Sequence, residues 1–534
     1  MIQQRLLCCS KTIGRSYYGN SYYTDRALSD IGRTLSSAAY GNGRSSSYGR
    51  TPCDSPRALS SNVYGNGRSS SYDRTPCDSR RALSSNVYGN ESSSLHRALS
   101  EIKRGWIAHD ENAKGKVKAS HPNLEFLAEM MRQDERDWLS HEGMYFELGR
   151  RTNVVLGAFV WNTSRGQACG GIRMRSYEKT EDYVRDGLRL AIGMGRKSAL
   201  AGLWAGGGKG VIAIDPKHPV KDSETRKNVM LDYGDFLSSL RGCYVAAEDA
   251  GLFVEDCDNV FSRTRFMTCI SPTFGGSGNP SVPTAIGVAT AIESAIDFRS
   301  QGKETVQGKT FAIQGAGNVS RPLMNRLFEL GAKSIICTDV DEDVLSRAEN
   351  EVIPPLSSSL DLRLVEHGDL SILSENVNVL SPCAYGGIIT EETTAKMQCD
   401  IVCGAANNQL LDPVRGDLAM TLRGITYVPD FVANRMGIVN CADEAFGRVG
   451  TLGDHNADPA VSRHLVGKEG DWENSVWNIT AHVLQLAEER NITPGQAANE
   501  LADEMANRLH PIWPNRSRDI QVSVREQWLR SYDL

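Results

Sequence analysis

Two lysines stand twelve positions apart in an apolar, glycine-rich stretch that runs from Gly193 to Pro216. The neighbours of Lys197 and Lys209 are mostly Ala, Leu, Trp and Gly, so the neutral form of each lysine is favoured. A lysine with a lowered pKa can exchange protons near neutral pH, which suits general acid–base chemistry. The triple glycine Gly206–Gly208 is expected to let a substrate approach the backbone just before Lys209. The alternative is a glycine-rich turn followed by a solvated lysine.

A pair of carboxylates ends the short apolar run Tyr244–Gly251, Y-V-A-A-E-D-A-G. The run predicts a buried strand that finishes at Glu248 and Asp249. A carboxylate in such a place is unfavourable unless a cation pairs with it, and we expect Lys209 to pair with Asp249. A salt bridge with a purely structural role is the alternative.

A glycine-rich turn follows the predicted strand Thr310–Gln314 and reads G-A-G-N-V-S. In this variant of the dinucleotide fingerprint, Gly315 allows the tight turn, Gly317 admits a pyrophosphate, and the small Ser320 can replace the third glycine. The expected cofactor-binding residues in this turn are Gly315, Ala316, Gly317, Asn318, Val319 and Ser320.

An acidic residue ends the second predicted strand of the same unit, Ser334–Asp339. Asp339 lies 24 residues after Gly315, close to the position where a carboxylate accepts hydrogen bonds from the ribose hydroxyls. That carboxylate would repel a 2′-phosphate. The sequence therefore predicts NAD as the cofactor, in preference to NADP.

The stretch Leu203–Pro216 resembles the signature L-x-x-G-G-G-K-G-V-x-x-x-D-P of the glutamate/leucine/phenylalanine/valine dehydrogenase superfamily, and Ala247–Gly251 resembles its A-E-D-x-G motif. The resemblance spans roughly residues 135–515 and is strongest to leucine dehydrogenases. It implies reversible oxidative deamination of an amino acid to a 2-oxo acid and ammonium, with hydride passing to the nicotinamide. It also implies a homo-oligomer that needs no metal.

The resemblance assigns roles to several residues. Lys209 is expected to activate water and stabilise the developing charge, while Asp249 shuttles protons. Lys197, with the backbone of Gly170 and Gly171, is expected to hold the α-carboxylate. Asn407 matches the asparagine that stands beside both the nicotinamide and the substrate, so it counts as a substrate-binding and a cofactor-binding residue.

The side-chain pocket is expected to be apolar, because Cys169 stands where relatives that use glutamate have a lysine. Without that cation, a second buried carboxylate would be unpaired. We therefore expect an apolar L-amino acid such as leucine, valine or isoleucine as substrate. Phenylalanine or glutamate remains the alternative, the latter if Arg435 reaches into the pocket. The other residues matched to this pocket are Ala247, Thr268, Ile438 and Cys441.

The order of predicted elements indicates an α/β protein of two domains. A substrate-binding (dimerisation) domain is expected at 116–282, a Rossmann domain at 283–437, and C-terminal helices that return to the first domain at 438–534. The first domain should contain a helix from Thr180 to Gly193, and the last helix should begin at Thr493-Pro494. An inserted loop is expected at 450–471. The segment Asn434-Arg435-Met436-Gly437 replaces the N-A-G-G hinge of relatives, which puts the hinge geometry in question.

The first 115 residues are expected to be disordered. A 24-residue repeat begins with R-T-L-S-S at Arg33 and R-A-L-S-S at Arg57 and Arg81, and each unit has too few apolar residues to form a core. We interpret the repeats as a tandem duplication; an array that binds a partner is the alternative. Residues 1–24 contain three basic and no acidic residues before Asp25, which favours a mitochondrial transit peptide over a plastid or cytoplasmic location.

The composition of the 534 residues is that of an ordinary soluble protein, with a formal net charge of −6. Nothing in it indicates nucleic acid or a membrane as partner. The 13 cysteines form no C-x-x-C pair, so we expect free thiols and neither a disulfide framework nor a structural zinc. Two other classes of function remain: a nucleotide-binding protein without catalysis, and an interaction scaffold built on the repeats.

Overall fold

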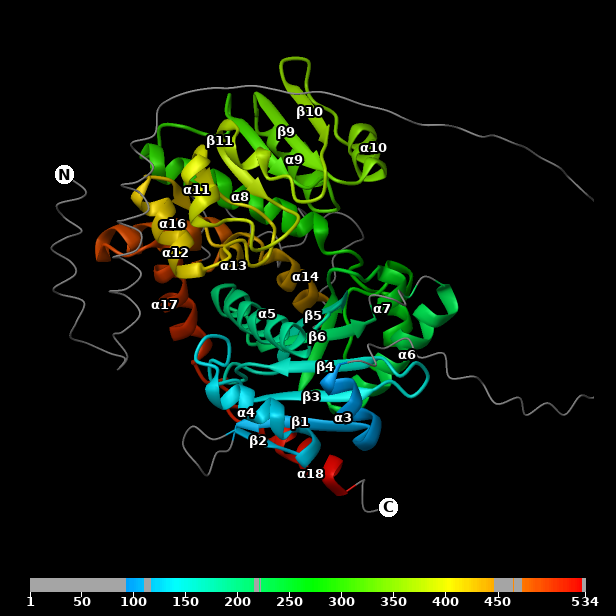
Figure 1. The fold of residues 1–534 in the computed structure, drawn as a ribbon. Helices are drawn as coiled ribbons and strands as arrows, with labels where there is room; N and C mark the ends of the chain where they lie inside the picture. Colours follow the sequence, from blue (N-terminus) through cyan, green and yellow to red (C-terminus); the bar gives the residue numbers. More distant parts are fainter. Residues whose placement is uncertain are drawn as a thin grey trace, which may run out of the picture. The chain divides into compact units, whose positions relative to one another are not determined.

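The computed structural model describes residues 93–109, 117–215, 220, 222–445, 464 and 473–530. Two β-sheets, each with its own helices, organise these residues, as the two-domain α/β prediction required (Figure 1). The predicted transit peptide, the repeats up to residue 92 and, apart from His464, the predicted inserted loop at 450–471 lie outside the described residues.

The first sheet has seven strands in the order β2-β1-β3-β4-β6-β5-β7. Strands β6, β5 and β7 are parallel, and the remaining pairs are antiparallel. The strands are β1 (Arg104–His109), β2 (Val117–Ala119), β3 (Gly143–Leu148), β4 (Val155–Val160), β5 (Ala168–Ser176), β6 (Gly206–Ile214) and β7 (Tyr244–Glu248). The helices of this part are α3 (Ser94–Ile102), α4 (Glu125–Gln133), α5 (Thr180–Leu200), α6 (Ser223–Ser239) and α7 (Val254–Phe261), with 3-10 turns at Pro122–Leu124 and Pro272–Phe274.

Both faces of this sheet are buried, because the side chains of β1, β3, β4 and β6 alternate between two apolar clusters. Along β4, Val155 and Phe159 join α5 in one cluster, whereas Leu156 and Val160 join α6 and the C-terminal helix in the other. A period of two is what a pleated strand imposes when helices cover both of its faces.

The second sheet has six parallel strands in the order β10-β9-β8-β11-β12-β13. This is the order of a doubly wound dinucleotide-binding sheet. The strands are β8 (Thr310–Gln314), β9 (Ser334–Asp339), β10 (Ser359–Leu364), β11 (Asn376–Pro382), β12 (Gln398–Val402) and β13 (Thr426–Tyr427). The helices are α8 (Ser281–Ser300), α9 (Ser320–Glu329), α10 (Glu342–Glu351), α11 (Glu391–Lys396) and α12 (Pro413–Leu422), with a 3-10 turn at Ser371–Ser374.

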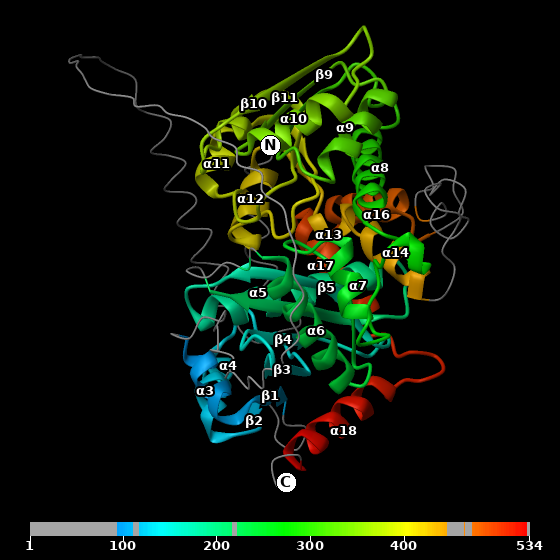
Figure 2. The same cartoon turned by 90° about the vertical axis from the view of Figure 1, so that its right-hand side faces the viewer.

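The C-terminal helices are divided between the two parts. They are α13 (Asp430–Ala433), α14 (Met436–Ala445), α16 (Val476–Arg490), α17 (Pro494–Ala506) and α18 (Arg516–Arg530). Helix α17 packs against α5, and α18 lies beside β1 (Figure 2), but α16 packs against α8. Thr493 caps α17 at its predicted start, since its side chain accepts a hydrogen bond from the Gln496 amide at 3.3 Å. The predicted boundary at 437/438 falls inside α14.

Regular structure is present earlier in the chain than the sequence indicated. The prediction of a disordered region through residue 115 is wrong for residues 93–109, which form α3 and β1. Helix α3 buries Leu95, Leu99 and Ile102, an amphipathic spacing of four and three residues, and β1 pairs with both β2 and β3. The R-A-L-S tract at Arg97 has the same sequence as the start of the repeats at Arg57 and Arg81, so this segment was assigned to the disordered repeat region.

Helix α5 is longer than predicted and lies unusually close to β6. It extends to Leu200, so that Lys197 stands in its last turn. A Cβ added at Gly207 would lie 2.4 Å from the Ala191 carbonyl oxygen and 2.9 Å from the Gly195 Cα atom. Only glycine fits at either position, and this contact fixes the separation between the helix and the strand.

Two glycine-to-alanine changes within α5 test this close packing. In Gly195→Ala, the new Cβ would lie 2.5 Å from the Trp161 ring and 3.1 Å from the Gly207 Cα atom, so we expect a loss of about 1–3 kcal/mol in the free energy of unfolding. Gly193→Ala is the matched control, because a Cβ there meets nothing within 4 Å and should add up to about 1 kcal/mol through helix propensity. Urea unfolding of both variants measures the difference, and equal stabilities would contradict the packing argument.

Candidate active site

A buried ion pair joins the two residues expected to carry the chemistry. Lys209 lies in the middle of β6 with only 2% of its surface exposed, and its Nζ donates a hydrogen bond to the carboxylate of Asp249, directly after β7. Burial lowers the pKa of Lys209 from its ordinary value, although Asp249 opposes this shift. Burial alone would raise the pKa of Asp249, but Lys209 and Arg173 hold it well below its usual range.

Arg173 completes this charge cluster and was not identified from the sequence. Its Nη2 lies 3.7 Å from the Asp249 carboxylate, and its Nη1 donates to Asp186 of α5 at 3.0 Å. Arg173 stands two residues after Gly171 on β5 and therefore faces the same side of the sheet. Side chains alternate between the two faces of a strand. This rule, applied to the strand that precedes the two lysines, could have placed Arg173 on the same face as Gly171.

Lys197 reaches the second sheet's domain from the last turn of α5. Its Nζ donates to the side-chain oxygen of Asn407, after β12, at 2.7 Å. Asn434 donates to the same oxygen at 3.1 Å and to the Ala405 carbonyl at 2.9 Å, so this hinge residue orients Asn407. Burial lowers the pKa of Lys197 to about 8, although the Asp430 carboxylate opposes the shift.

The paired glycines of β5 have no room for side chains. A Cβ at Gly170 would lie 1.9 Å from the Gly208 carbonyl oxygen, and one at Gly171 would lie 2.5 Å from the Asp249 Cβ. The Tyr244 hydroxyl donates to the carbonyls of both glycines, at 2.7 and 3.0 Å, and fixes this stretch of backbone.

The triple glycine before Lys209 does not leave space for a substrate, so that prediction is wrong. All three residues belong to strand β6, and added Cβ atoms would collide with protein atoms. The nearest of these are the Asn162 carbonyl oxygen at Gly206, the backbone of α5 at Gly207, and the Tyr244 ring at Gly208. The glycines allow close packing of the protein against itself.

The residues expected in the side-chain pocket are uncharged, and all of them are buried except Cys169, which is half-buried. Ala247 and Cys441 belong to one apolar cluster, and Ile438 is on the same helix as Cys441, three residues earlier. The Thr268 hydroxyl donates to the Ala246 carbonyl at 3.0 Å. Burial raises the pKa of the Cys169 thiol to about 12, which keeps it neutral.

Arg435 is held away from any role as a pocket cation. It is fully buried, and its Nη2 donates to the Asn474 carbonyl, just before α16, at 2.8 Å. The alternative in which this residue binds a substrate carboxylate has no contact that favours it.

The nucleotide-binding residues lie at the carboxyl ends of β8 and β9. Gly315 has a φ of +94°, which favours glycine, and a Cβ there would lie 2.7 Å from Ala384. A Cβ at Gly317 would meet nothing within 4 Å, so this turn has the open space that a pyrophosphate needs. One carboxylate oxygen of Asp339 accepts from the Ala316 amide at 2.8 Å, which holds the turn against the end of β9. The neighbouring residues fit the same arrangement: Asn318 accepts from Arg321 at 3.0 Å, Val319 precedes α9, and the buried Ser320 begins it.

Comparison with known proteins identifies the family. Residues 275–507 match Glutamate/Leucine/Phenylalanine/Valine dehydrogenase, and residues 152–265 match the Glu/Leu/Phe/Val dehydrogenase dimerisation domain. Leucine dehydrogenase of Geobacillus stearothermophilus is 36% identical over 65% of this chain and 85% of its own length. Valine dehydrogenase of Streptomyces albus is 37% identical over 68% of this chain and 92% of its own. The chain belongs to the Glu/Leu/Phe/Val dehydrogenase family.

A solved structure supports the same assignment for this Glu/Leu/Phe/Val dehydrogenase. L-tryptophan dehydrogenase from Nostoc punctiforme is similar with a TM-score of 0.52 and 26% identity, over 74% of this chain and 99% of that one. The family resemblance and the two-domain architecture inferred from the sequence are thereby confirmed. The protein is an amino-acid dehydrogenase with a Rossmann domain for NAD(P).

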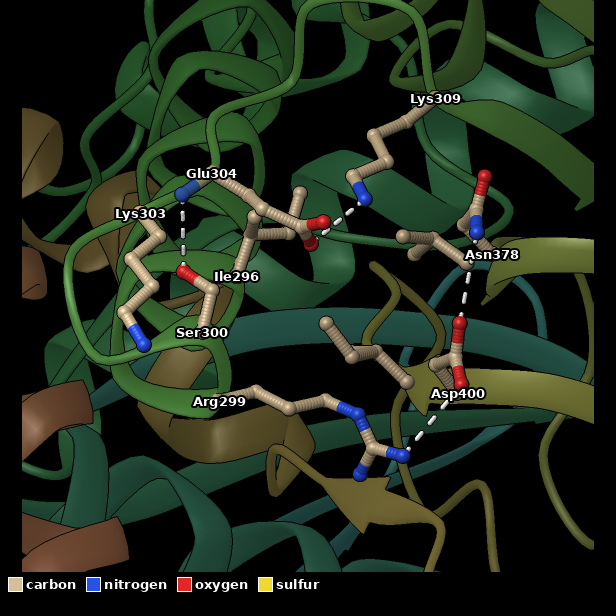
Figure 3. Close-up of a pocket in the computed structure, with 10 residues that line it drawn as sticks. Ile296, Arg299, Ser300, Lys303, Glu304, Lys309, Asn378 and Asp400 are labelled. Carbon is tan, nitrogen blue, oxygen red and sulfur yellow. Dashed lines mark hydrogen bonds and ion pairs between the residues drawn. The ribbon is translucent and has the colours of Figure 1, made fainter.

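A polar hollow of about 430 Å³ in this dehydrogenase is not its active site (Figure 3). The hollow lies at the amino ends of β8, β11 and β12, whereas ligands of parallel sheets bind at the carboxyl ends. Four of its charged side chains form two ion pairs, Lys309 with Glu304 at 2.7 Å and Arg299 with Asp400 at 3.3 Å. In the described part of the chain, no group of three or more metal-ligating side chains is arranged for a metal ion. No helix there is long and apolar enough to cross a membrane.

Glu248 of this dehydrogenase gives a pH-dependent prediction. Burial raises the pKa of Glu248 to about 7, and the charges of Asp249 and Asp256 act in the same direction. A carboxyl with a raised pKa in the folded state is protonated there at pH 5, and the protein loses stability as the pH rises through 7. We therefore expect Glu248→Gln to gain about 1 kcal/mol over the wild type between pH 5 and pH 8, after allowance for solvent screening. Urea unfolding at both values tests this, and a difference that does not change with pH would contradict it.

Proposed function

We propose that this protein catalyses the NAD-dependent, reversible oxidative deamination of an apolar L-amino acid to its 2-oxo acid and ammonium. The observation that carries the proposal is the buried Lys209–Asp249 pair on β6 and β7, with Lys197 on helix α5, which packs against β6. Two buried lysines with lowered pKa values and one ionised carboxylate can bind an anionic substrate and move protons at neutral pH.

Each group of the site has a distinct part in this reaction. Lys197 and the backbone of Gly170 and Gly171 hold the α-carboxylate. The carboxylate replaces the side-chain oxygen of Asn407 as the hydrogen-bond acceptor of Lys197. Lys209 accepts a proton from water and stabilises the charge that develops on the substrate, and Asp249 carries protons to and from the amino group. When bound, NAD accepts the hydride from the α-carbon.

The uncharged surroundings of the side-chain pocket support an apolar substrate. Cys169 has a neutral thiol and therefore offers no cation to a substrate carboxylate. Arg435 donates instead to the Asn474 carbonyl, just before α16. The related leucine and valine dehydrogenases act on aliphatic amino acids by name, which agrees with this proposal.

The position of Asp339 supports NAD as the cofactor in preference to NADP. Its carboxylate stands at the end of β9 and accepts hydrogen bonds from the amides of Ala316 and Asp341, at 2.8 and 3.1 Å. An anion fixed at this place would repel a 2′-phosphate.

We also propose that this protein forms a homo-oligomer. We further propose that it is located in mitochondria. The match of residues 152–265 to a dimerisation domain supports self-association. The proposed location is based on Arg5, Lys11 and Arg15 in a segment without acidic residues.

A substrate panel tests the proposed reaction. We expect kcat/KM with leucine, valine or isoleucine to exceed that with glutamate on the order of 100-fold or more, because an unpaired buried carboxylate costs several kcal/mol. Lys209→Ala is the control: turnover should fall on the order of 100-fold to 10,000-fold while NADH binding, followed by fluorescence, is retained. Glutamate as the best substrate, or a Lys209→Ala variant with more than a tenth of the activity, would overturn the proposal.

Cofactor preference is tested at Asp339. The wild type should use NAD better than NADP, and Asp339→Asn should raise the NADP/NAD ratio of kcat/KM on the order of 10-fold or more, because the 2′-phosphate no longer meets an anion. Glu349→Gln, which removes an exposed charge from α10, is the matched control and should leave the ratio unchanged. A wild-type enzyme that prefers NADP would show the ribose argument to be wrong.

A further inference from the structure

Two buried thiols touch among the residues that are expected to form the side-chain pocket. The Sγ atoms of Cys269 and Cys441 lie 3.3 Å apart, and the two residues are 0% and 9% exposed. Cys269 directly follows Thr268, and Cys441 is itself one of the expected pocket residues. No other thiol–thiol contact is formed among the cysteines of the described residues.

The backbone around these thiols is fixed by a neighbouring carboxylate. Glu444, three residues after Cys441 on α14, accepts hydrogen bonds from the amides of Cys269 and Ser277, at 2.8 and 2.9 Å. Asn440 donates to the Ser277 hydroxyl at 2.8 Å. Asn440 and Glu444, on either side of Cys441 in helix α14, thus bind the segment that follows β7. These hydrogen bonds keep the two sulfur atoms in contact.

We propose that Cys269 and Cys441 form an oxidative modification site, which a peroxide converts into a reversible disulfide that alters the amino-acid pocket. The more exposed Cys441 sulfur attacks the peroxide oxygen, giving a sulfenic acid and one molecule of water. The Cys269 sulfur then attacks the Cys441 sulfur, and the departing hydroxide takes the Cys269 proton as a second water. Two thiols are oxidised by two electrons, and one peroxide is reduced to two waters.

The order of these steps follows from the environment of Cys269. Its hydrogen bond with Cys441, together with burial, holds the pKa of the Cys269 thiol well above its ordinary value. A neutral, fully buried thiol reacts slowly with a peroxide in solution. Contact with Cys441 gives Cys269 a partner that is already in place once Cys441 is oxidised.

The disulfide would change the pocket because its bond length is about 2.0 Å, well short of the present separation of the sulfurs. The Cys441 side chain would move toward Cys269, and a displacement of about 1 Å in a substrate-positioning group can reduce activity on the order of 100-fold. This part of the proposal rests on the proposed function, whereas formation of the disulfide does not.

The test treats the full-length protein with hydrogen peroxide and then with dithiothreitol. We expect a cross-linked peptide containing Cys269 and Cys441 in mass spectrometry. We also expect at least a 5-fold fall in kcat/KM with leucine, which dithiothreitol reverses. Cys269→Ala should retain its own activity after the same treatment. Cys257→Ala is the matched control, because it removes another buried thiol without such a contact and should remain as sensitive as the wild type.

The possible results separate this proposal from the proposed function. Absence of the cross-linked peptide while other thiols are oxidised would overturn the modification site. A complete cross-link with unchanged kcat/KM would overturn its effect on the pocket. An untreated enzyme without turnover on any amino acid would refute the proposed function, and the cross-linked peptide would still decide whether the site exists.

Discussion

The close backbone contact between α5 and β6 is the constraint on which the site depends. Gly195 and Gly207 meet in this contact, and each lysine stands two residues further along its own element. Two residues on a strand return to the same face, so Lys209 stays on the side of the sheet covered by α5. Two residues on a helix turn through about 200°, so Lys197 points away from the sheet and reaches Asn407. One contact therefore determines the direction of both lysines.

The charges of the site are arranged so that lysine chemistry remains possible in a buried place. Asp249 lies between two cations, Lys209 and Arg173, and Arg173 is itself bound to Asp186. Without Arg173, a single buried pair would favour the charged form of Lys209 more strongly. The second cation opposes that effect, which keeps the lysine able to give up a proton.

Much of the fold and the site could be predicted from the sequence, because glycine motifs and strand-ending carboxylates carry position-specific information. The strand before Gly315 and the pairing of Lys209 with Asp249 are examples. The reason for Gly206–Gly208 could not be found in this way, because a glycine needed for packing and one needed for a ligand look alike in a sequence. Helix α3 was missed because its R-A-L-S tract resembles the repeats. The Cys269–Cys441 contact joins residues 172 positions apart and only the tertiary structure shows it.

The hydrogen bond from Lys197 to Asn407 also bears on which derivatives of an amino acid the enzyme can select. The lysine already has a neutral acceptor, the amide oxygen of Asn407. In the proposed reaction, a free carboxylate exchanges that acceptor for an anionic one, so that the attraction between two opposite charges is added to the hydrogen bond. An amino-acid amide, an ester or a residue within a peptide presents only another neutral carbonyl and gains little by the exchange. If Lys197 binds the substrate as proposed, the side chain of Asn407 competes with the substrate for that lysine, and this competition favours free amino acids over blocked ones.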